Sequence, residues 1–284
     1  MCGIAAWIGR KPARPERVQT MLTHIAPRGR DACGVALFAG GEWEIVKTQG
    51  SVMDPRNMEL LVGAVEHLRP TGVLMHVRAA THGSPYDPCN NHPIFGDSSL
   101  TIHNGVVHVD AKFEAAGETD TEQMVRAMEA HGLAGGLAMT RGSYAIMRVD
   151  LADPREVQVI RNEYSPLQWL AGRYAHLFAS LPFRVGRQCS RIVAPHRLIT
   201  LDAQTLEVDS KFLEVDPKSL ANHEDMPMVQ AAEAADRRPR QLMLPRPFMG
   251  PAAPNRYLEP VPCSQCGRTT YNYWRLCVAC NAGA

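Results

Sequence analysis

The sequence has neither a long apolar run nor a marked excess of charge of either sign. Among 284 residues, 30 Lys and Arg nearly balance 29 Asp and Glu, which leaves a formal net charge of +1. Such a balance creates no overall field that would attract nucleic acid or an anionic membrane. A membrane span needs about 20 consecutive apolar residues, and the first apolar stretch is cut short by Arg10-Lys11, where a secretory signal would have to continue. We therefore expect a cytoplasmic protein with no membrane partner.

The sequence also lacks internal repeats, and its eight cysteines are unevenly distributed. Four of them form two C-x-x-C pairs close to the C-terminus. The others are scattered through the chain, at Cys2, Cys33, Cys89 and Cys189. In a cytosolic protein this distribution indicates metal ligands and free thiols rather than a disulfide framework.

The size and composition fit one large core with a small appendage, or two modest domains, because 45% of the residues are hydrophobic. Several predicted strands cluster together with few helices, which favours an α+β fold with antiparallel sheets covered by helices. Helices are predicted at 15–26, at 54–68 and from 118–122 onward. Strands are predicted at 2–8, 35–38, 43–46, 72–75, 100–102 (ending at His103-Asn104-Gly105), 142–150, 156–160, 167–171, 177–180 and 198–208.

The amino-acid composition of the chain changes near residue 217. Eight of the 21 prolines lie between Pro227 and Pro262, and strand and helix patterns fade except for a short possible helix at 228–238. This composition predicts a linker or a strap on a surface. We therefore divide the chain into a main domain at 2–216, a Pro-rich segment at 217–260 and a small module at 261–284.

Cys2 stands directly behind the initiator Met1. Because methionine aminopeptidase accepts small second residues, we expect Cys2 to become the N-terminal residue. One residue would then carry a thiol nucleophile and a free α-amine. That amine, with a reference pKa of about 7.7–8.0, can take the thiol proton directly or through a water. Taken alone, Cys2 also fits an inert, buried small residue.

Several further motifs follow Met1-Cys2-Gly3-Ile4 along the chain. They are Arg28-Gly29-x-Asp31-x-x-Gly34, His76-x-Arg78-x-Ala80-Thr81-His82-Gly83, Asn91-His92-Pro93, His103-Asn104-Gly105 and Glu118-Thr119-Asp120-Thr121-Glu122. In this order and rough spacing they resemble class II glutamine amidotransferase domains, which are N-terminal-nucleophile hydrolases. Such domains occur in glucosamine-6-phosphate synthase, amidophosphoribosyltransferase, asparagine synthetase and glutamate synthase. The resemblance covers about residues 2–210 and implies a four-layer αββα sandwich.

The resemblance implies catalytic roles for Cys2, Asn104 and Gly105. Hydrolysis of glutamine requires attack on an amide, stabilisation of a tetrahedral oxyanion, release of ammonia and hydrolysis of a thioester. Cys2 would form the thioester, and its own amine would act as general base and then as general acid. The side-chain amide of Asn104 and the backbone N–H of Gly105 would donate to the oxyanion. No cofactor is expected for this chemistry.

The resemblance also implies how glutamine is held. The planar guanidinium of Arg78 would bind the α-carboxylate, and Asp120 would bind the α-ammonium. Thr81, His82 and Gly83 would complete the pocket. The histidines receive structural roles because the N-terminal amine replaces a histidine base.

Each of these residues also has an ordinary interpretation, because Arg78 and Asp120 could be solvated charges and Asn-Gly is a common turn dipeptide. The chain also departs from the family at two places. Ala79 stands where several members have tryptophan after the arginine, so the aromatic wall of the pocket is missing or supplied from elsewhere. Ala179-Ser180-Leu181 stands where some members have an acidic residue.

The module at 261–284 carries a C-x2-C-x10-C-x2-C pattern. Its ligands would be Cys263, Cys266, Cys277 and Cys280. Four thiolates predict a closed, tetrahedral and structural zinc site in a zinc ribbon, with a redox dithiol pair as the alternative. Tyr271, Tyr273 and Trp274 would form its apolar face. Arginines in and before the module, at Arg268, Arg275 and 237–240, favour docking onto a partner protein, with nucleic acid or a solvated face as alternatives.

Together these features predict a glutaminase subunit that passes ammonia to a separate acceptor protein. Two alternatives stay open. One is a non-catalytic adaptor that binds glutamine and acts through the zinc ribbon. The other is an N-terminal-cysteine hydrolase of a different amide.

Overall fold

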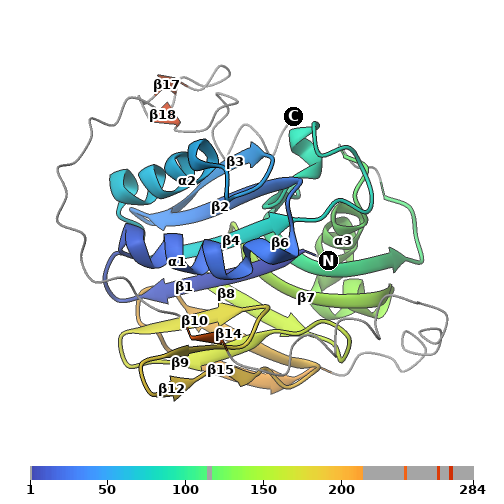
Figure 1. The fold of residues 1–284 in the computed structure, drawn as a ribbon. Helices are drawn as coiled ribbons and strands as arrows, with labels where there is room; N and C mark the ends of the chain where they lie inside the picture. The colour runs from blue at the N-terminus through green and yellow to red at the C-terminus, as the bar shows by residue number, and fades with distance from the viewer. Residues whose placement is uncertain (1, 114–116, 214–239, 242–260, 263–268, 271–284) are drawn as a thin grey trace.

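The computed structural model describes residues 2–113 and 117–213, with the backbone of three two-residue segments at 240–241, 261–262 and 269–270 (Figure 1). The helix predicted at 228–238 and the four cysteines of the predicted zinc site lie outside the described residues. The predicted domain boundaries near 216 and 260 also stay predictions.

The first sheet is built around β1 (Gly3–Gly9), in which all seven residues are buried. Its strand order is β13-β9-β10-β1-β4-β2-β3, and every neighbouring pair is antiparallel. The other strands are β2 (Ala32–Ala39), β3 (Glu42–Gln49), β4 (Gly72–Arg78), β9 (Gln168–Ala171), β10 (Ala175–Ala179) and β13 (Arg191–Ile192). The strands predicted at 35–38 and 43–46 are confirmed as β2 and β3, which form a hairpin around Gly40-Gly41. Both turn glycines have positive φ, which suits a tight hairpin turn.

The second sheet has six antiparallel strands in the order β15-β14-β8-β7-β6-β5. The strands are β5 (Ile94–Phe95), β6 (Ser99–Val109), β7 (Thr140–Asp150), β8 (Asp153–Arg161), β14 (Arg197–Asp202) and β15 (Val208–Phe212). The single strand predicted at 198–208 is wrong, because the chain turns back after Asp202. The Asp202 carboxylate closes this turn by accepting the N–H groups of Gln204 and Thr205, each at 2.7 Å.

In the described ranges three α-helices cover the sheets: α1 (Pro15–Ile25), α2 (Pro55–Leu68) and α3 (Asp120–Ala138). Two of them start at a capping side chain. Asp54 accepts the N–H of Arg56 at the start of α2, and Thr119 accepts the N–H of Glu122 at the start of α3. Short 3-10 turns lie at Ala26–Arg28 (η1) and Pro88–Asn90 (η2). No helix in the described ranges is long and apolar enough to cross a membrane.

The apolar side chains form three cores that separate four layers. One core joins α1 and α2 to the first sheet, the second lies between the two sheets, and the third joins the second sheet to α3. The described residues therefore form helix, sheet, sheet and helix layers (Figure 1), as the resemblance implied. Smaller pairings involve β11 (Phe183–Val185), β12 (Gln188–Cys189) and β16 (Arg240–Gln241), and separately β17 (Val261–Pro262) and β18 (Thr269–Thr270).

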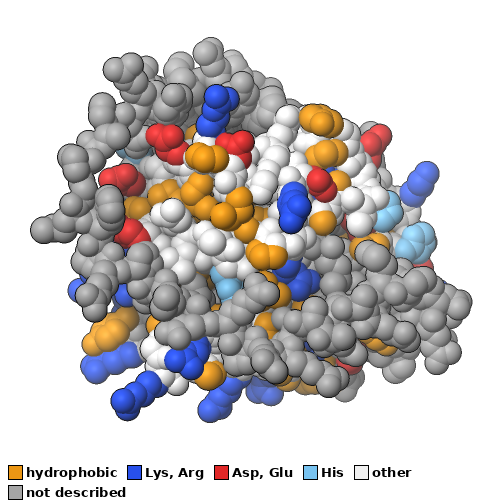
Figure 2. Space-filling model, in the orientation of Figure 1, with side chains coloured by type: hydrophobic (Ala, Val, Ile, Leu, Met, Phe, Trp, Pro, Cys, Tyr) orange, Lys and Arg blue, Asp and Glu red, His pale blue; other side chains and the backbone are white. Residues whose placement is uncertain are grey.

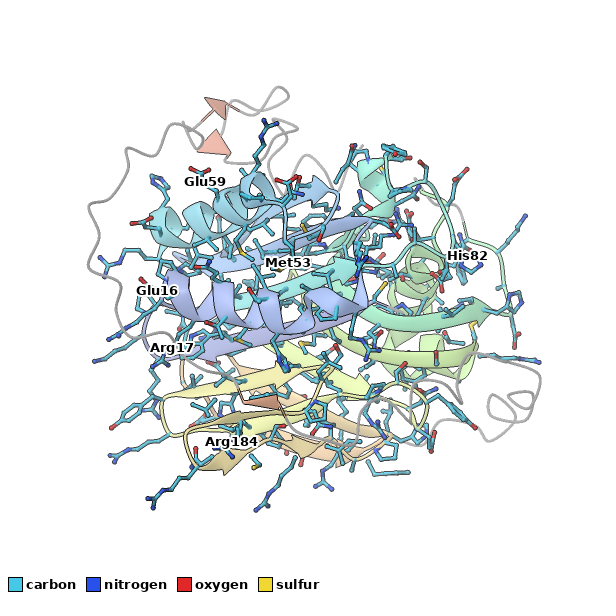
Figure 3. The ribbon with its side chains drawn as sticks, viewed as in Figure 1. Glu16, Arg17, Met53, Glu59, His82 and Arg184 are labelled. Carbon is cyan, nitrogen blue, oxygen red and sulfur yellow. The ribbon has the colours of Figure 1, made fainter. Side chains whose placement is uncertain are left out.

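The face built by α1 and α2 carries exposed apolar side chains. Figure 2 shows them gathered where the two helices lie side by side. Met53, labelled in Figure 3 at this position, is 55% exposed. The two helices thus bury their inner faces on the sheet without covering all of the apolar surface between them.

The core between the sheets should dominate the stability of the domain. Phe178 is fully buried there and stacks on Trp169 with ring centroids 5.8 Å apart. We expect Phe178→Ala to lower the free energy of unfolding by about 3–5 kcal/mol, because it leaves a cavity in a close-packed core. Phe212→Ala, at a residue that is 67% exposed, should change it by less than about 0.5 kcal/mol. Urea unfolding followed by circular dichroism tests both, and equal effects would contradict this two-sheet core.

Candidate active site

Cys2 lies where the first sheet brings two strand ends together. It immediately precedes β1, and the pairing of Gly3 with Val77 places it beside Arg78, the last residue of β4. The Cys2 thiol donates to the carbonyl oxygen of Ala79 at 3.6 Å, and the residue is only 8% exposed. A Cβ at Gly3 would lie 2.8 Å from Val77 Cγ2 and 2.9 Å from Ile25 O. Only glycine therefore fits directly behind the nucleophile.

The surroundings of Cys2 keep its thiol protonated at neutral pH. Burial raises the pKa of Cys2 above its ordinary value, and the negative charge of Asp120 acts in the same direction, whereas the positive charge of Arg78 opposes it. A nucleophilic role for Cys2 consequently requires a base that removes the thiol proton.

The motif Arg28-Gly29-x-Asp31 forms hydrogen bonds to the backbone around Cys2 and Arg78. The sequence alone assigned no individual roles to its residues. Arg28 Nε donates to the carbonyl of Cys2 at 2.8 Å. The Asp31 carboxylate accepts the N–H of Ala80 at 2.7 Å, and the Asp31 N–H donates to the carbonyl of Arg78 at 3.0 Å. These bonds fix the backbone on both sides of the nucleophile.

Arg78 is 3% exposed, and its guanidinium organises the loop that follows β4. It donates to Asn91 Oδ1 at 2.9 Å, to the carbonyl of Gly83 at 3.0 Å and to the carbonyl of His82. The side chains of Thr81 and His82 are exposed, and His82 is labelled on the surface in Figure 3. The structure therefore brings Thr81, His82 and Gly83 close to Arg78 through their backbone. Their contacts with a substrate stay a prediction.

Asn104 and Gly105 lie inside β6, so the prediction that this strand ends at His103-Asn104-Gly105 is wrong. Asn104 is fully buried, and neither its Oδ1 nor its Nδ2 has a hydrogen-bond partner among the described residues. A buried unpaired amide is unfavourable by about 1–3 kcal/mol, so this side chain is a strong candidate for a ligand-binding group. Gly105 has a φ of 151°, and a Cβ there would lie 1.8 Å from Ser143 O.

Asp120, the first residue of α3, ties that helix to β6. Its carboxylate accepts the N–H of Val107 and the N–H of Thr121, both at 2.9 Å. Burial raises the pKa of Cys2 and lowers the pKa of Arg78, and the negative charge of Asp120 acts on both groups, adding to the first shift and opposing the second. The fold thus gathers Cys2, Arg78 and Asp120 from three separate elements, as predicted.

Three histidines lie buried behind this group: His76 on β4, His92 in the loop and His103 on β6. The rings of His76 and His92 stack with centroids 4.0 Å apart. Burial lowers the pKa of His76 to about 3 and also lowers the pKa of His92 and of His103. All three are therefore neutral at physiological pH.

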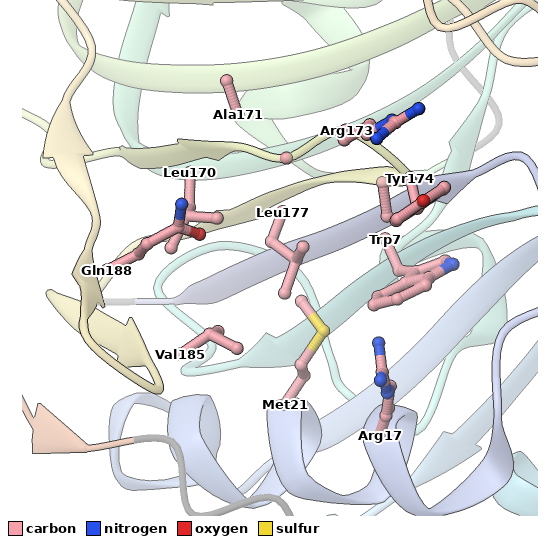
Figure 4. Close-up of a pocket in the computed structure, with 12 residues that line it drawn as sticks. Trp7, Arg17, Met21, Leu170, Ala171, Arg173, Tyr174, Leu177, Val185 and Gln188 are labelled. Carbon is pink, nitrogen blue, oxygen red and sulfur yellow. The ribbon is translucent and has the colours of Figure 1, made fainter.

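A cavity of about 370 Å³ lies away from these residues (Figure 4). Its walls include Trp7, Arg17, Met21, Leu170 and Leu177, and none of the predicted site residues lines it. The Arg17 guanidinium lies 5.0 Å from the centroid of the Trp7 ring, a cation–π contact. Because Trp7 lies toward the opposite end of β1 from Cys2, this cavity is separate from the candidate active site.

Within the described ranges, no group of His, Cys, Asp or Glu is arranged to hold a metal ion. The predicted zinc ligands are all outside those ranges, so the zinc site stays a prediction.

Comparison with known proteins identifies homologues. The glutamine–fructose-6-phosphate aminotransferase (isomerizing) of Chlorobaculum tepidum is 34% identical over 190 residues, which are 59% of this chain and 30% of that protein. The enzyme of the same name from Shouchella clausii is 30% identical over 199 residues, 63% of this chain and 32% of that protein. The chain thus spans about a third of the length of these relatives. No protein-family model matches it.

The fold is shared with a solved amidotransferase. Glutamine phosphoribosylpyrophosphate amidotransferase from B. subtilis superposes with a TM-score of 0.58 at 19% identity, covering 76% of this chain and 50% of that one. The homologues of this chain are glutamine amidotransferases, which are enzymes of the class II type, and the predicted amidotransferase-like fold is confirmed.

The buried histidines should make stability depend on pH. Their folded pKa values lie below the unfolded value of about 6.5, so below that pH the unfolded chain binds protons that the folded chain does not. The free energy of unfolding should be largest above pH 6.5 and fall toward pH 3, by up to about 1.4 kcal/mol per pH unit for each histidine. Urea titrations at pH 7.5, 6.0 and 5.0 measure this slope. His76→Gln should flatten it and the surface variant His82→Gln should not, whereas a pH-independent free energy would contradict burial of neutral histidines.

Proposed function

We propose, from the homology with class II glutamine amidotransferases, that this chain hydrolyses the side-chain amide of L-glutamine to glutamate and ammonia. The observation that carries the proposal is the juxtaposition of a buried Cys2 thiol with Arg78 and Asp120, beside a β6 that holds the unpaired amide of Asn104. Cys2 Sγ attacks the amide carbon and gives a tetrahedral oxyanion. Collapse breaks the C–N bond, ammonia departs with an added proton, and water hydrolyses the thioester.

The base in this scheme is the α-amine of Cys2, exposed when Met1 is removed. Burial raises the pKa of the thiol, so the proton must be taken up by a nearby group. An α-amine with a pKa of about 7.7–8.0 accepts that proton near neutrality and returns it to the departing ammonia. Burial lowers the pKa of the three histidines, which makes each of them a weaker base than an ordinary imidazole.

The oxyanion hole in this scheme consists of the Asn104 side-chain amide and the Gly105 N–H. Asn104 Nδ2 is buried without a partner among the described residues, so it can donate to an oxyanion without first breaking another bond. Each such donor contributes about 3–4 kcal/mol of transition-state stabilisation. Position 105 requires glycine, because a Cβ there would collide with Ser143 O.

The two charged groups of glutamine, its α-carboxylate and its α-ammonium, each bind a side chain of opposite charge in this scheme. Arg78 binds the α-carboxylate, and Asp120 binds the α-ammonium through lone pairs that its two backbone bonds leave available. Because the Arg78 guanidinium also holds the carbonyls of His82 and Gly83, binding of the carboxylate is coupled to the position of this loop. Thr81, His82 and Gly83 would then close one side of the pocket.

We further propose that a separate protein accepts the ammonia and is recruited through the C-terminal zinc ribbon. The names of the matched relatives include an acceptor, fructose 6-phosphate, but the match covers only about a third of their length. The residues described here account for glutamine chemistry alone. Contact of the arginine-bearing tail with nucleic acid is the alternative that a binding assay would test.

One backbone observation supports the zinc ribbon. Val261 pairs with Thr270 and Pro262 with Thr269, antiparallel, and the sequence places Cys263 and Cys266 between these paired segments. Four thiolates suit tetrahedral Zn²⁺. Bound zinc would hold this small module folded.

Replacing Cys2 should abolish activity. We expect methionine-processed protein to release ammonia from glutamine, Cys2→Ala to lose at least about 10³-fold, and Cys189→Ser, at an exposed cysteine, to stay within about two-fold. Intact mass should show loss of Met1, and 6-diazo-5-oxo-norleucine should add once, at Cys2. Glutamine binding without turnover or adduct would instead favour the adaptor, and an adduct formed only with bulky acyl amides would favour another amide substrate.

The tail should bind one zinc ion per chain. Elemental analysis of the purified full chain should give a zinc-to-protein ratio near one, falling toward zero in Cys263→Ser and Cys277→Ser, because each removes one of four thiolate ligands. Cys89→Ser is the matched control and should keep the metal. Full zinc content in both ligand variants would refute the site.

A further inference from the structure

On the edge of β6 that faces the candidate active site, side chains form the hydrogen bonds that a neighbouring strand would otherwise form. β6 pairs with β7 along its whole length, from Ser99 to Val109, but with β5 only at Leu100 and Thr101. Beyond Thr101 no strand covers this second edge in the described part of the chain. Two side chains bond to the backbone there: His76 Nε2 to the carbonyl of His103 at 3.1 Å, and Asp120 to the N–H of Val107 at 2.9 Å.

These two bonds flank the residues proposed to stabilise the oxyanion. His103 directly precedes Asn104, and Val107 follows Gly105 by two positions. Backbone groups at a sheet edge normally take their geometry from the neighbouring strand. Asn104 and Gly105 pair with β7 on one edge, and on the other edge the backbone around them is held by side chains that reach across from β4 and α3.

We propose that His76 and Thr121 are positioning residues, which set the placement of Asn104 and Gly105 through His103; this inference rests on the proposed glutaminase function. His76 holds the peptide group between His103 and Asn104. Thr121 holds the His103 ring, since its hydroxyl lies 2.8 Å from His103 Nδ1. Neither residue touches the substrate in this scheme.

The direction of each bond follows from the acceptors. A carbonyl oxygen only accepts, so His76 Nε2 carries the proton donated to His103 O. For the same reason His103 Nε2 donates toward Ser143 O at 3.4 Å, which leaves His103 Nδ1 to accept from the Thr121 hydroxyl. The Thr121 oxygen then accepts from His92 Nε2 at 3.2 Å. All three rings are neutral in this chain of bonds, in agreement with their lowered pKa values.

The network connects all parts of the proposed site. His76 lies two residues before Arg78 on β4, Thr121 directly follows Asp120 on α3, and His103 directly precedes Asn104 on β6. Displacing one member by about 1 Å would misplace the oxyanion donors, and such misplacement typically lowers the rate by about 10²-fold. The effect should fall on kcat, because the oxyanion exists only in the transition state and the intermediates.

Matched variants at two positions test the proposal. Thr121→Val removes the hydroxyl with little change in shape, and Thr121→Ser retains it. His76→Phe keeps a ring to stack on His92 but removes the donor, and His76→Gln retains an N–H at the place of Nε2. Steady-state glutaminase kinetics give kcat and KM for each, and urea unfolding confirms that each variant is folded.

We expect Thr121→Val and His76→Phe to lower kcat by about 10–100-fold with KM changed less than about three-fold. Thr121→Ser should stay within about three-fold of the unmodified protein, and His76→Gln should recover most of the lost rate. The proposal is overturned if the paired variants behave alike, or if the loss appears in KM alone. An unmodified protein with no glutaminase activity would refute the proposed function itself, and this inference with it, whereas active protein with unaffected variants refutes only the network.

Discussion

The antiparallel pairing of β1 with β4 is the constraint on which the rest of the site depends. It places Cys2 at the start of a strand whose seven residues are all buried, beside Arg78 at the end of the neighbouring strand. A nucleophile held this way has little freedom to move, because the sheet and two cores fix its backbone. Arg28 and Asp31 add bonds to the same corner, so the sulfur position is determined by the fold.

Burial controls the chemistry of the polar groups around this corner. The thiol is kept protonated, the three histidines are kept neutral, and the guanidinium of Arg78 is satisfied by loop carbonyls. Asn104 differs from these groups, since both its Oδ1 and its Nδ2 are unpaired among the described residues. Unpaired buried polar groups are found in folded proteins mainly where binding or catalysis uses them.

Position 79 shows how the backbone can carry a role that its side chain does not. Ala79 stands where several amidotransferases have tryptophan, yet its carbonyl accepts the Cys2 thiol. This contact is made by the backbone and therefore does not depend on the side chain at position 79. The separate cavity under Trp7 and Arg17 lies toward the far end of β1.

The sequence by itself determined most of the local elements and pointed to the candidate site residues. Local residue patterns predicted the helices at α1 and α2 and the strands at β1, β2 and β3, because these signals act over a few residues. Ordered motifs were enough to single out Cys2, Arg78, Asn104 and Asp120. Only the tertiary structure showed that β6 runs through Asn104-Gly105, that the 198–208 segment is two strands, and that His76 reaches the backbone of β6. Those features depend on pairing and burial between residues far apart in the chain, which local propensity does not encode.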